Sequence, residues 1–178
     1  MAGTTTRLLT VAEYDKIPNP PGGRYALYHG ELVEVPFAKS PHIRAQWQIR
    51  HLFEKAAGPG GVVNQEMPYR PLPEYECWAA DVAYLSRARW DSMGDWLAGA
   101  PELVVEVLSP SNRRAKMADK EKLCLENGCL EFWQVDLSLR QVRVSTPDGR
   151  TITYKTGQQI PLFFAPGASI SVAAIFAE

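Results

Sequence analysis

The sequence predicts a mixed α/β (α+β) fold in which helices pack on the faces of one central mixed β-sheet. Residues 103–108 read Leu-Val-Val-Glu-Val-Leu, a nearly continuous apolar run that is typical of a strand covered on both faces. Residues 41–57 carry apolar side chains at helical spacing, which indicates a helix with one buried face. Helices and strands then follow in mixed order with short connections, and that order favours one sheet flanked by helices.

The N-terminal elements are predicted from capping and turn signals. Thr10 and Glu13 have the spacing of a capping box, which predicts a short helix over Val11–Lys16. A proline- and glycine-rich break follows. After it, we expect a β-hairpin whose turn lies at His29-Gly-Glu31 and whose strands are Tyr25–Tyr28 and Leu32–Val35.

The middle of the chain is predicted as helix, strand, strand, strand, helix, strand. The first helix covers Pro41–Ala57, and Pro41 suits its first turn. The second covers Asn112–Asn127, because Gly128 occupies the position of a helix C-cap. The strand after the first helix should end before the proline at position 68. The four strands are Val62–Met67, Trp78–Leu85, Leu103–Leu108 and Leu130–Val135.

Two further features complete the prediction. The segment Arg87–Gly99 is expected to contain a helical turn around Trp90 and Trp96. Towards the C-terminus, Thr146-Pro-Asp-Gly149 is a strong turn signal, and it predicts a hairpin of Gln141–Ser145 with Thr151–Lys155.

Composition limits the classes of function. The chain has 178 residues, about one domain, and its 19 Lys and Arg face 20 Asp and Glu, so bulk charge does not indicate a nucleic-acid binder. The three cysteines and three histidines lack zinc-ligand spacing, and we expect reduced, buried thiols. The sequence shows neither a secretory signal nor a run of about 18 apolar residues, and it therefore predicts a cytoplasmic protein without membrane contact.

Glu106 and Asp81 are charged residues in otherwise apolar predicted strands. A buried carboxylate loses hydration worth several kcal/mol unless it is paired or binds a cation. Two such acids on neighbouring strands could share one divalent cation, and Mg²⁺ prefers oxygen ligands. The alternatives are that Glu106 pairs with an Arg or Lys in the core and that Asp81 caps a turn.

The predicted helix over residues 112–127 is basic in its first half. Cations in the first turn oppose the helix dipole by ~0.3–1 kcal/mol each, and a nearby phosphate or carboxylate would offset that cost. The alternative is an ordinary solvated face. Between residues 113 and 122 the five cations and two anions give a net charge of +3, from Arg113, Arg114, Lys116, Lys120 and Lys122 against Asp119 and Glu121.

Several strings in the chain resemble a known family. They are Gly30-Glu31, Ala80-Asp81, the run from Pro101 through Glu106 to Pro110, Lys120, and Gly128-Cys-Leu-Glu-Phe-Trp-Gln-Val-Asp136. These strings resemble the Uma2-type putative restriction endonucleases, a branch of the PD-(D/E)xK nuclease superfamily. The resemblance implies a single restriction-endonuclease-like domain over residues 1–178, with its core at about 41–136 and added N- and C-terminal hairpins.

The resemblance also implies roles for the matching residues. Asp81 and Glu106 would be the carboxylate ligands of Mg²⁺, with Mn²⁺ as a possible substitute, and the Val107 carbonyl would face the same metal. Lys120 would be a catalytic lysine carried on the helix, and Glu31 an auxiliary acid. The residues expected to contact DNA are Lys116, Arg113 and Gln46.

Four positions depart from the family pattern. Ala80 replaces the proline before Asp81, where a proline would set only the backbone. Leu108 stands where the superfamily carries a lysine, two residues after Glu106 and so on the same face of the strand. The family moves that lysine to the helix, at Lys120. Lys116 and Cys124 occupy positions where relatives more often carry Asp and Tyr. These differences bear on activity more than on fold.

The implied function is metal-dependent hydrolysis of phosphodiester bonds in DNA, double-stranded by resemblance, by a homodimer that could cut both strands. A stripe of His42, Gln46 and Arg50 on the first long helix could contact the DNA backbone or simply face solvent. The alternative function is that of a non-catalytic nuclease-fold protein that binds DNA or another protein. The acidic pI of the sequence and Leu108 favour that alternative.

Overall fold

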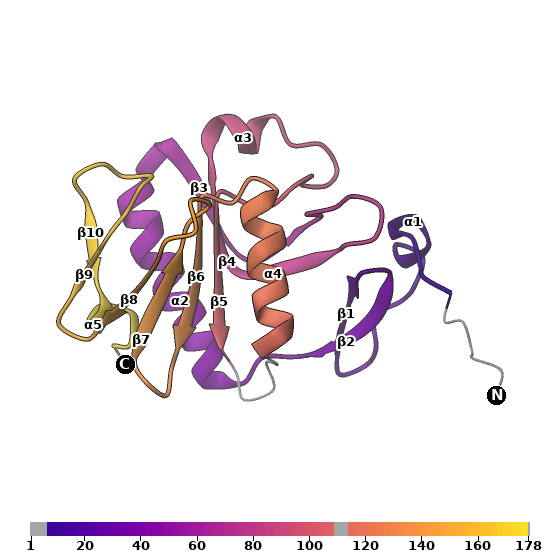
Figure 1. Cartoon of the computed structure of the whole chain (residues 1–178), viewed down its shortest axis with the longest axis horizontal. Coiled ribbons are helices and arrows are strands. Elements are labelled where there is room, and N and C mark those ends of the chain that lie inside the picture. The colour runs from indigo at the N-terminus through magenta and orange to yellow at the C-terminus, as the bar shows by residue number, and fades with distance from the viewer. Residues whose placement is uncertain (1–6, 109–113, 178) are drawn as a thin grey trace.

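The centre of the molecule is a six-stranded mixed β-sheet (Figure 1). The structure is a computed structural model that describes residues 7–108 and 114–177. All neighbouring strands pair antiparallel except β5 and β6, which are parallel. The predicted α+β class and the order of elements from the first long helix to β6 are confirmed. In sheet order the strands are β3 (Gly61–Tyr69), β4 (Trp78–Ser86), β5 (Leu103–Leu108), β6 (Glu131–Asp136), β7 (Gln141–Ser145) and β8 (Thr151–Lys155).

Two long helices, α2 (Ser40–Ala57) and α4 (Arg114–Glu126), cover opposite faces of the sheet (Figure 1). A parallel strand pair needs a crossover connection, and α4 is the crossover between β5 and β6. On the α2 face, Phe53 meets Trp133 edge to face, with ring centroids 5.2 Å apart. On the α4 face, Met117 and Phe132 belong to a second buried cluster.

The side chains of β5 alternate between these two cores. Val105 and Val107 lie in the cluster on the α2 face, whereas Val104 lies in the cluster on the α4 face. Because a strand has a period of two, Glu106 points towards α4. Burial on both faces explains why this strand is apolar at nearly every position.

The side chains of β4 alternate between the two faces of the sheet, and this alternation is interrupted at Asp81. Trp78 and Ala80 belong to the core on the α4 face, whereas Val82, at the same parity, belongs to the core on the α2 face. Asp81 lies opposite Glu66, between the strand pairs 65–82 and 67–80. Glu66 has a backbone φ of +50°, which is unusual for a residue other than glycine. This local distortion of the β3–β4 pair places Asp81 within reach of α2.

The predicted N-terminal elements are confirmed, with small shifts in their bounds. Helix α1 (Val11–Tyr14) carries the capping box, and β1 (Gly23–Tyr28) pairs with β2 (Glu31–Pro36) in a separate hairpin. Leu27 and Cys77 exchange two backbone hydrogen bonds of 3.0 Å. The hairpin is therefore attached to the chain directly before β4, and it lies beside α4 (Figure 1).

The C-terminal hairpin of β7 and β8 is also confirmed, but the chain after it forms elements that the sequence analysis did not identify. These are β9 (Gln159–Pro161), β10 (Ser169–Ser171) and α5 (Val172–Ile175). Side chains from all three enter the core on the α2 face. The segment is therefore part of the main fold.

Two other bounds differ from the prediction. Strand β3 continues through Pro68 to Tyr69, which is possible because β3 is an edge strand of the sheet. Helix α3 (Arg87–Asp91) contains Trp90 and not Trp96, and a short 3₁₀ turn, η1 (Gly58–Gly60), follows α2. Across residues 7–108 and 114–177, no helix has both the length and the apolar character needed to cross a membrane.

Candidate active site

The site lies where strands β4 and β5 separate. Their pairing runs from Tyr84–Leu103 to Val82–Val105 and then stops. The next residues along each strand are Asp81, whose side chain turns towards α2, and Glu106, whose side chain turns towards α4. The Val107 backbone N–H donates to Asp81 Oδ2 over 2.6 Å, so a carboxylate takes the place of a strand carbonyl. This opening between Asp81 of β4 and Glu106 and Val107 of β5, here called the fork, brings the Val107 backbone into contact with Asp81.

Asp81 is held from the side of α2. Its Oδ1 lies 3.0 Å from Gln46 Nε2 and 3.0 Å from His42 Nε2. A carboxylate only accepts hydrogen bonds, so His42 carries a proton on Nε2. Burial lowers the pKa of His42, but the bond to Asp81 and the nearby acids outweigh it and raise the pKa overall.

Glu66 is a third acid at this site. Gln46 Nε2 also donates to Glu66 Oε1 over 2.6 Å, so one amide group joins the Asp81 and Glu66 carboxylates. Arg24 of β1 lies 3.0 Å from Glu66 Oε2. The N-terminal hairpin therefore contributes a cation to the edge of the site.

Glu106 is held from the side of α4. Lys120 Nζ lies 2.7 Å from Glu106 Oε1, and the residues are only 5% and 6% exposed. Lys120 also donates to the Ala79 carbonyl over 3.2 Å. Pro68, which faces Ala79 across the β3–β4 ladder, has no N–H to offer that carbonyl. Lys120 thus joins α4 to both strands of the fork.

The buried pair has shifted protonation equilibria. Burial raises the pKa of Glu106 to about 7, Lys120 opposes that shift, and the charge of Asp81 adds to it. Burial lowers the pKa of Lys120, but the adjacent Glu106 carboxylate outweighs burial and the pKa lies above its usual value. Lys120 is therefore protonated at neutral pH, while Glu106 can take up or release a proton.

The structure places the other predicted residues differently. Glu31 begins β2 and is exposed, and no interaction joins it to the fork within the described residues. Lys116 Nζ lies 3.9 Å from the centre of the Tyr28 ring. Arg113 lies outside the described residues. Gln46 is 3% exposed, so a polar stripe through it cannot be a solvent face, and a DNA contact would require its amide to leave two carboxylates.

Sequence reasoning missed Glu66 and did not connect His42 to Asp81. Glu66 sits in the polar stretch Asn64-Gln-Glu66, which no periodicity assigns to the core. The signal that could have found it is its position: counted back along a β3–β4 hairpin, it falls opposite Asp81.

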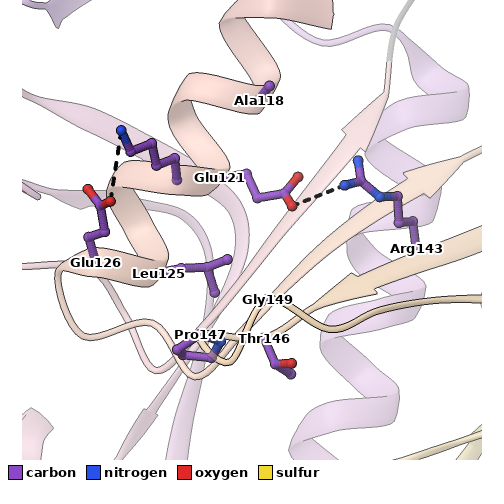
Figure 2. Close-up of a pocket in the computed structure, with 9 residues that line it drawn as sticks. Ala118, Glu121, Leu125, Glu126, Arg143, Thr146, Pro147 and Gly149 are labelled. Carbon is purple, nitrogen blue, oxygen red and sulfur yellow. Dashed lines mark hydrogen bonds and ion pairs between the residues drawn. The ribbon is translucent and has the colours of Figure 1, made fainter.

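A pocket elsewhere on α4 contains none of the predicted site residues (Figure 2). It lies between the helix and the turn that joins β7 to β8. Glu121 in its wall lies 3.1 Å from Arg143 and accepts a hydrogen bond of 2.6 Å from Gln134. The acids of this pocket are thus already paired, and the fork remains the better candidate site.

The fork consists of carboxylates rather than a ready-made metal cage. Within residues 7–108 and 114–177, no cluster of three or more His, Cys, Asp or Glu side chains is arranged to hold a metal ion. The alternative that Glu106 pairs with a cation from the core is realised by Lys120. Any metal here would therefore rest on two side chains and the backbone.

A family model described as "Uma2: Putative restriction endonuclease" matches residues 11–173. The chain belongs to the Uma2 family. The family assignment that the sequence motifs suggested is thereby confirmed, and the matched range contains every residue of the fork. No curated protein matches this Uma2 chain.

The Uma2 chain is also similar to a solved structure, the crystal structure of a putative nuclease belonging to DUF820 from Anabaena variabilis ATCC 29413. The two chains are 19% identical, and the match covers 94% of this chain and 97% of the other, with a TM-score of 0.82. At this identity, the likeness establishes a shared fold. The predicted nuclease-type fold is therefore confirmed.

Proposed function

We propose that the protein is a metal-dependent nuclease that hydrolyses phosphodiester bonds in double-stranded DNA. One observation carries the proposal: the β4–β5 ladder opens at Asp81 and Glu106, and buried Lys120 bonds to Glu106 at that point. Two acids and a lysine are groups that phosphodiester hydrolysis can use to bind a cation and to stabilise charge on phosphate. The description of the Uma2 family supports a nuclease-like activity.

The donor set at the fork fits Mg²⁺, and Mn²⁺ could replace it. Mg²⁺ is usually bound through one or two carboxylates plus waters and substrate phosphates, and Asp81 and Glu106 would supply the two carboxylates. The Val107 N–H points at Asp81, and in an extended strand the carbonyl of a residue points to the same side as its N–H. The Val107 carbonyl would be the third oxygen. When bound, the cation would polarise a phosphoryl oxygen and acidify a bound water.

The other residues of the fork have complementary roles. Lys120 keeps its proton at neutral pH and would offset the negative charge that grows on the phosphate during attack. Gln46 joins Asp81 to Glu66 and thereby fixes the orientation of the Asp81 carboxylate. Arg24 neutralises Glu66 at the rim. We further propose that Lys116, near the start of α4, and Glu31 act on the DNA side of the fork.

A non-catalytic, DNA- or protein-binding role is the second candidate, and one observation favours it. Each acid of the fork already has a cationic or donor side chain from the protein, since Lys120 meets Glu106 and His42 meets Asp81. A fork closed in this way could be purely structural. The two candidates differ in whether a divalent cation changes what the protein does to DNA.

Cleavage of supercoiled plasmid separates them. With Mg²⁺ or Mn²⁺, the wild-type protein should nick or linearise the plasmid, and Glu106→Gln should be slower by about a hundredfold or more. Glu121→Gln is the matched control, because it neutralises a half-buried acid on α4 that lies outside the fork. Equal cutting by wild type and Glu106→Gln would exclude the proposed site. DNA binding without any metal-dependent cutting would support the second candidate. Light scattering of the same samples would test the proposed homodimer.

A further inference from the structure

A second cluster of charged groups lies outside the fork, around His29. This residue forms the β1–β2 turn, and both of its ring nitrogens meet carboxylates. Nδ1 lies 2.7 Å from Glu76 Oε1, and Nε2 lies 2.6 Å from Asp119 Oδ2. Glu76 belongs to the segment directly before β4, and Asp119 lies on α4. One imidazole therefore joins three parts of the fold.

With Glu76 ionised, the arrangement requires a doubly protonated imidazole. Burial raises the pKa of Glu76, and the backbone N–H and the charge of His29 oppose that rise. Glu76 Oε1 accepts a hydrogen bond of 2.8 Å from the His29 backbone N–H, so this oxygen is an acceptor towards the ring as well. Asp119 is likewise an acceptor. Because a neutral imidazole has only one N–H, it would leave one carboxylate facing a lone pair. The pKa of His29 is raised, chiefly by the hydrogen bond to Asp119, with Glu76 adding to the effect against a smaller lowering by burial.

Glu76 explains why a cation is needed here. The residue is 1% exposed, and its Oε2 has no hydrogen-bond partner in the part of the chain that the structure describes. A buried carboxylate without a counter-ion is strongly destabilising. His29 supplies the counter-ion and, with its other nitrogen, reaches out to the half-exposed Asp119.

The contacts of the hairpin with α4 lie within the turn of the helix that precedes Lys120. Asp119, the residue before Lys120, meets His29, and Lys116, one turn earlier, lies over the ring of Tyr28. Tyr28 in turn stacks on Trp78, with ring centroids 5.0 Å apart and planes 26° apart. Lys120 Nζ lies 5.7 Å from the centre of the Trp78 ring. The hairpin thus contacts the part of α4 that carries Lys120.

We propose that His29 is a positioning residue: by bridging Glu76 and Asp119 it fixes α4 to the β1–β2 hairpin and so holds Lys120 against Glu106. The consequence for catalysis rests on the proposed nuclease function, whereas the bridge itself does not. Loss of the His29 proton at higher pH breaks the bridge, because a neutral ring cannot donate to both acids. The charged groups that face the ring are Glu76 from the segment before β4 and Asp119 from α4.

Asp119→Asn tests the charged bridge, because its amide oxygen can still accept a hydrogen bond but no longer carries the charge that holds the protonated ring. It leaves the buried His29–Glu76 pair intact, so the protein should fold, whereas His29→Gln would leave Glu76 without a counter-ion. The matched control is Glu126→Gln, which removes an exposed acid from the same helix. Two readouts are combined: the titration of His29 by NMR, and hydrogen exchange of the α4 amides from pH 6 to 9 after correction for the intrinsic rate.

In the wild type, the α4 amides should exchange about three- to tenfold faster above the His29 midpoint than below it, the range for a partly exposed charged hydrogen bond. In Asp119→Asn, exchange should be fast at pH 6 already, and the midpoint of His29 should fall. Glu126→Gln should behave as the wild type. An α4 exchange rate that is independent of pH in the wild type, or unchanged in Asp119→Asn, would overturn the proposal.

Plasmid cleavage then separates this proposal from the proposed function. If the variant exchanges as expected and the wild type cuts DNA, Asp119→Asn should lower kcat at pH 6 with little change in KM. If the exchange results hold but the wild type never cuts, the bridge stands and the nuclease function fails. If the protein cuts DNA while α4 ignores both pH and the variant, the bridge fails and the nuclease function stands.

Discussion

Replacing Lys120 by methionine should lower the free energy of unfolding, because it leaves the buried Glu106 carboxylate without a counter-ion. The side chains of Lys120 and Glu106 are 6% and 9% exposed, and removing one partner of a buried pair costs about 3–5 kcal/mol. That full cost applies only where Glu106 is ionised in the wild type, because a protonated carboxyl needs no counter-ion. The folded wild type has a Glu106 pKa of about 7. The penalty must therefore depend on pH.

The direction of this pH dependence follows from proton binding to Glu106. Below pH 7, Glu106 is protonated in both folded proteins, and Lys120→Met should cost only about 1–2 kcal/mol for the hydrogen bonds lost, including the one to Ala79. Above pH 7, the folded variant keeps a proton that the folded wild type releases. Its relative stability then falls by at most about 1.4 kcal/mol per pH unit, towards about 3–5 kcal/mol near pH 9.

Urea unfolding at pH 6, 7.5 and 9 measures this difference. Lys122→Met is the matched control on the same helix, because its side chain is 70% exposed and its ammonium lies 3.9 Å from Glu126. It should change the free energy of unfolding by less than about 0.5 kcal/mol at every pH. The double variant Lys120→Met/Glu106→Gln should recover most of the loss and show no slope. A destabilisation by Lys120→Met that is equal at all three pH values would refute the reasoning.

Three further predictions concern the core, the fork and the thiols. Phe53→Ala should lower the free energy of unfolding by about 3–5 kcal/mol, because Phe53 is fully buried against Trp133. Phe37→Ala, at an exposed position, should leave it unchanged. Equal effects of the two variants in urea unfolding would contradict the described core. Gln46→Ala should cost about 1–3 kcal/mol, because two carboxylates lose a shared donor, and an unchanged urea midpoint would show that the amide does not join them. Burial raises the pKa of Cys124 to about 12, so a thiol reagent at pH 8 should modify the cysteines only after unfolding, and rapid labelling of the native protein would be inconsistent with three buried thiols.

The sequence predicted the sheet and the two long helices from local signals, which were an apolar run in β5, a helical period in α2 and the C-cap glycine Gly128 for α4. Strand β5 is buried on both faces, so its apolar run marks it without ambiguity. Helix α2 shows one apolar face from Ala45 to Ala56, about three turns. The C-terminal strands have three residues each, and the prolines and the glycine among them interrupt any period. Their burial depends on the face that α2 leaves open, which no local pattern encodes.

The two halves of the candidate site differed in how much the sequence revealed. Glu106 was conspicuous because a carboxylate in an apolar strand demands a partner, and the structure supplies Lys120 from the helix where the family pattern placed it. The partners of Asp81 were not readable, because His42 and Gln46 lie on a helix whose polar stripe looks like any solvent face. Only the tertiary fold shows that part of this stripe is turned inward.

Glu66 shows why the remaining part of the site could not be predicted from the sequence. A non-glycine residue at φ +50° is held there by its surroundings, and here Arg24 and Gln46 bind its carboxylate from two different elements. The same distortion shifts the alternation of β4, so that Asp81 turns towards α2 while Glu106, on the next strand, turns towards α4. In a regular ladder, the side chains of β4 would alternate between the two faces of the sheet along the whole strand. The two acids are thus approached by different helices because one strand residue departs from regular geometry, and replacing Glu66 should disturb Asp81 more than it disturbs the distant partners of Glu106.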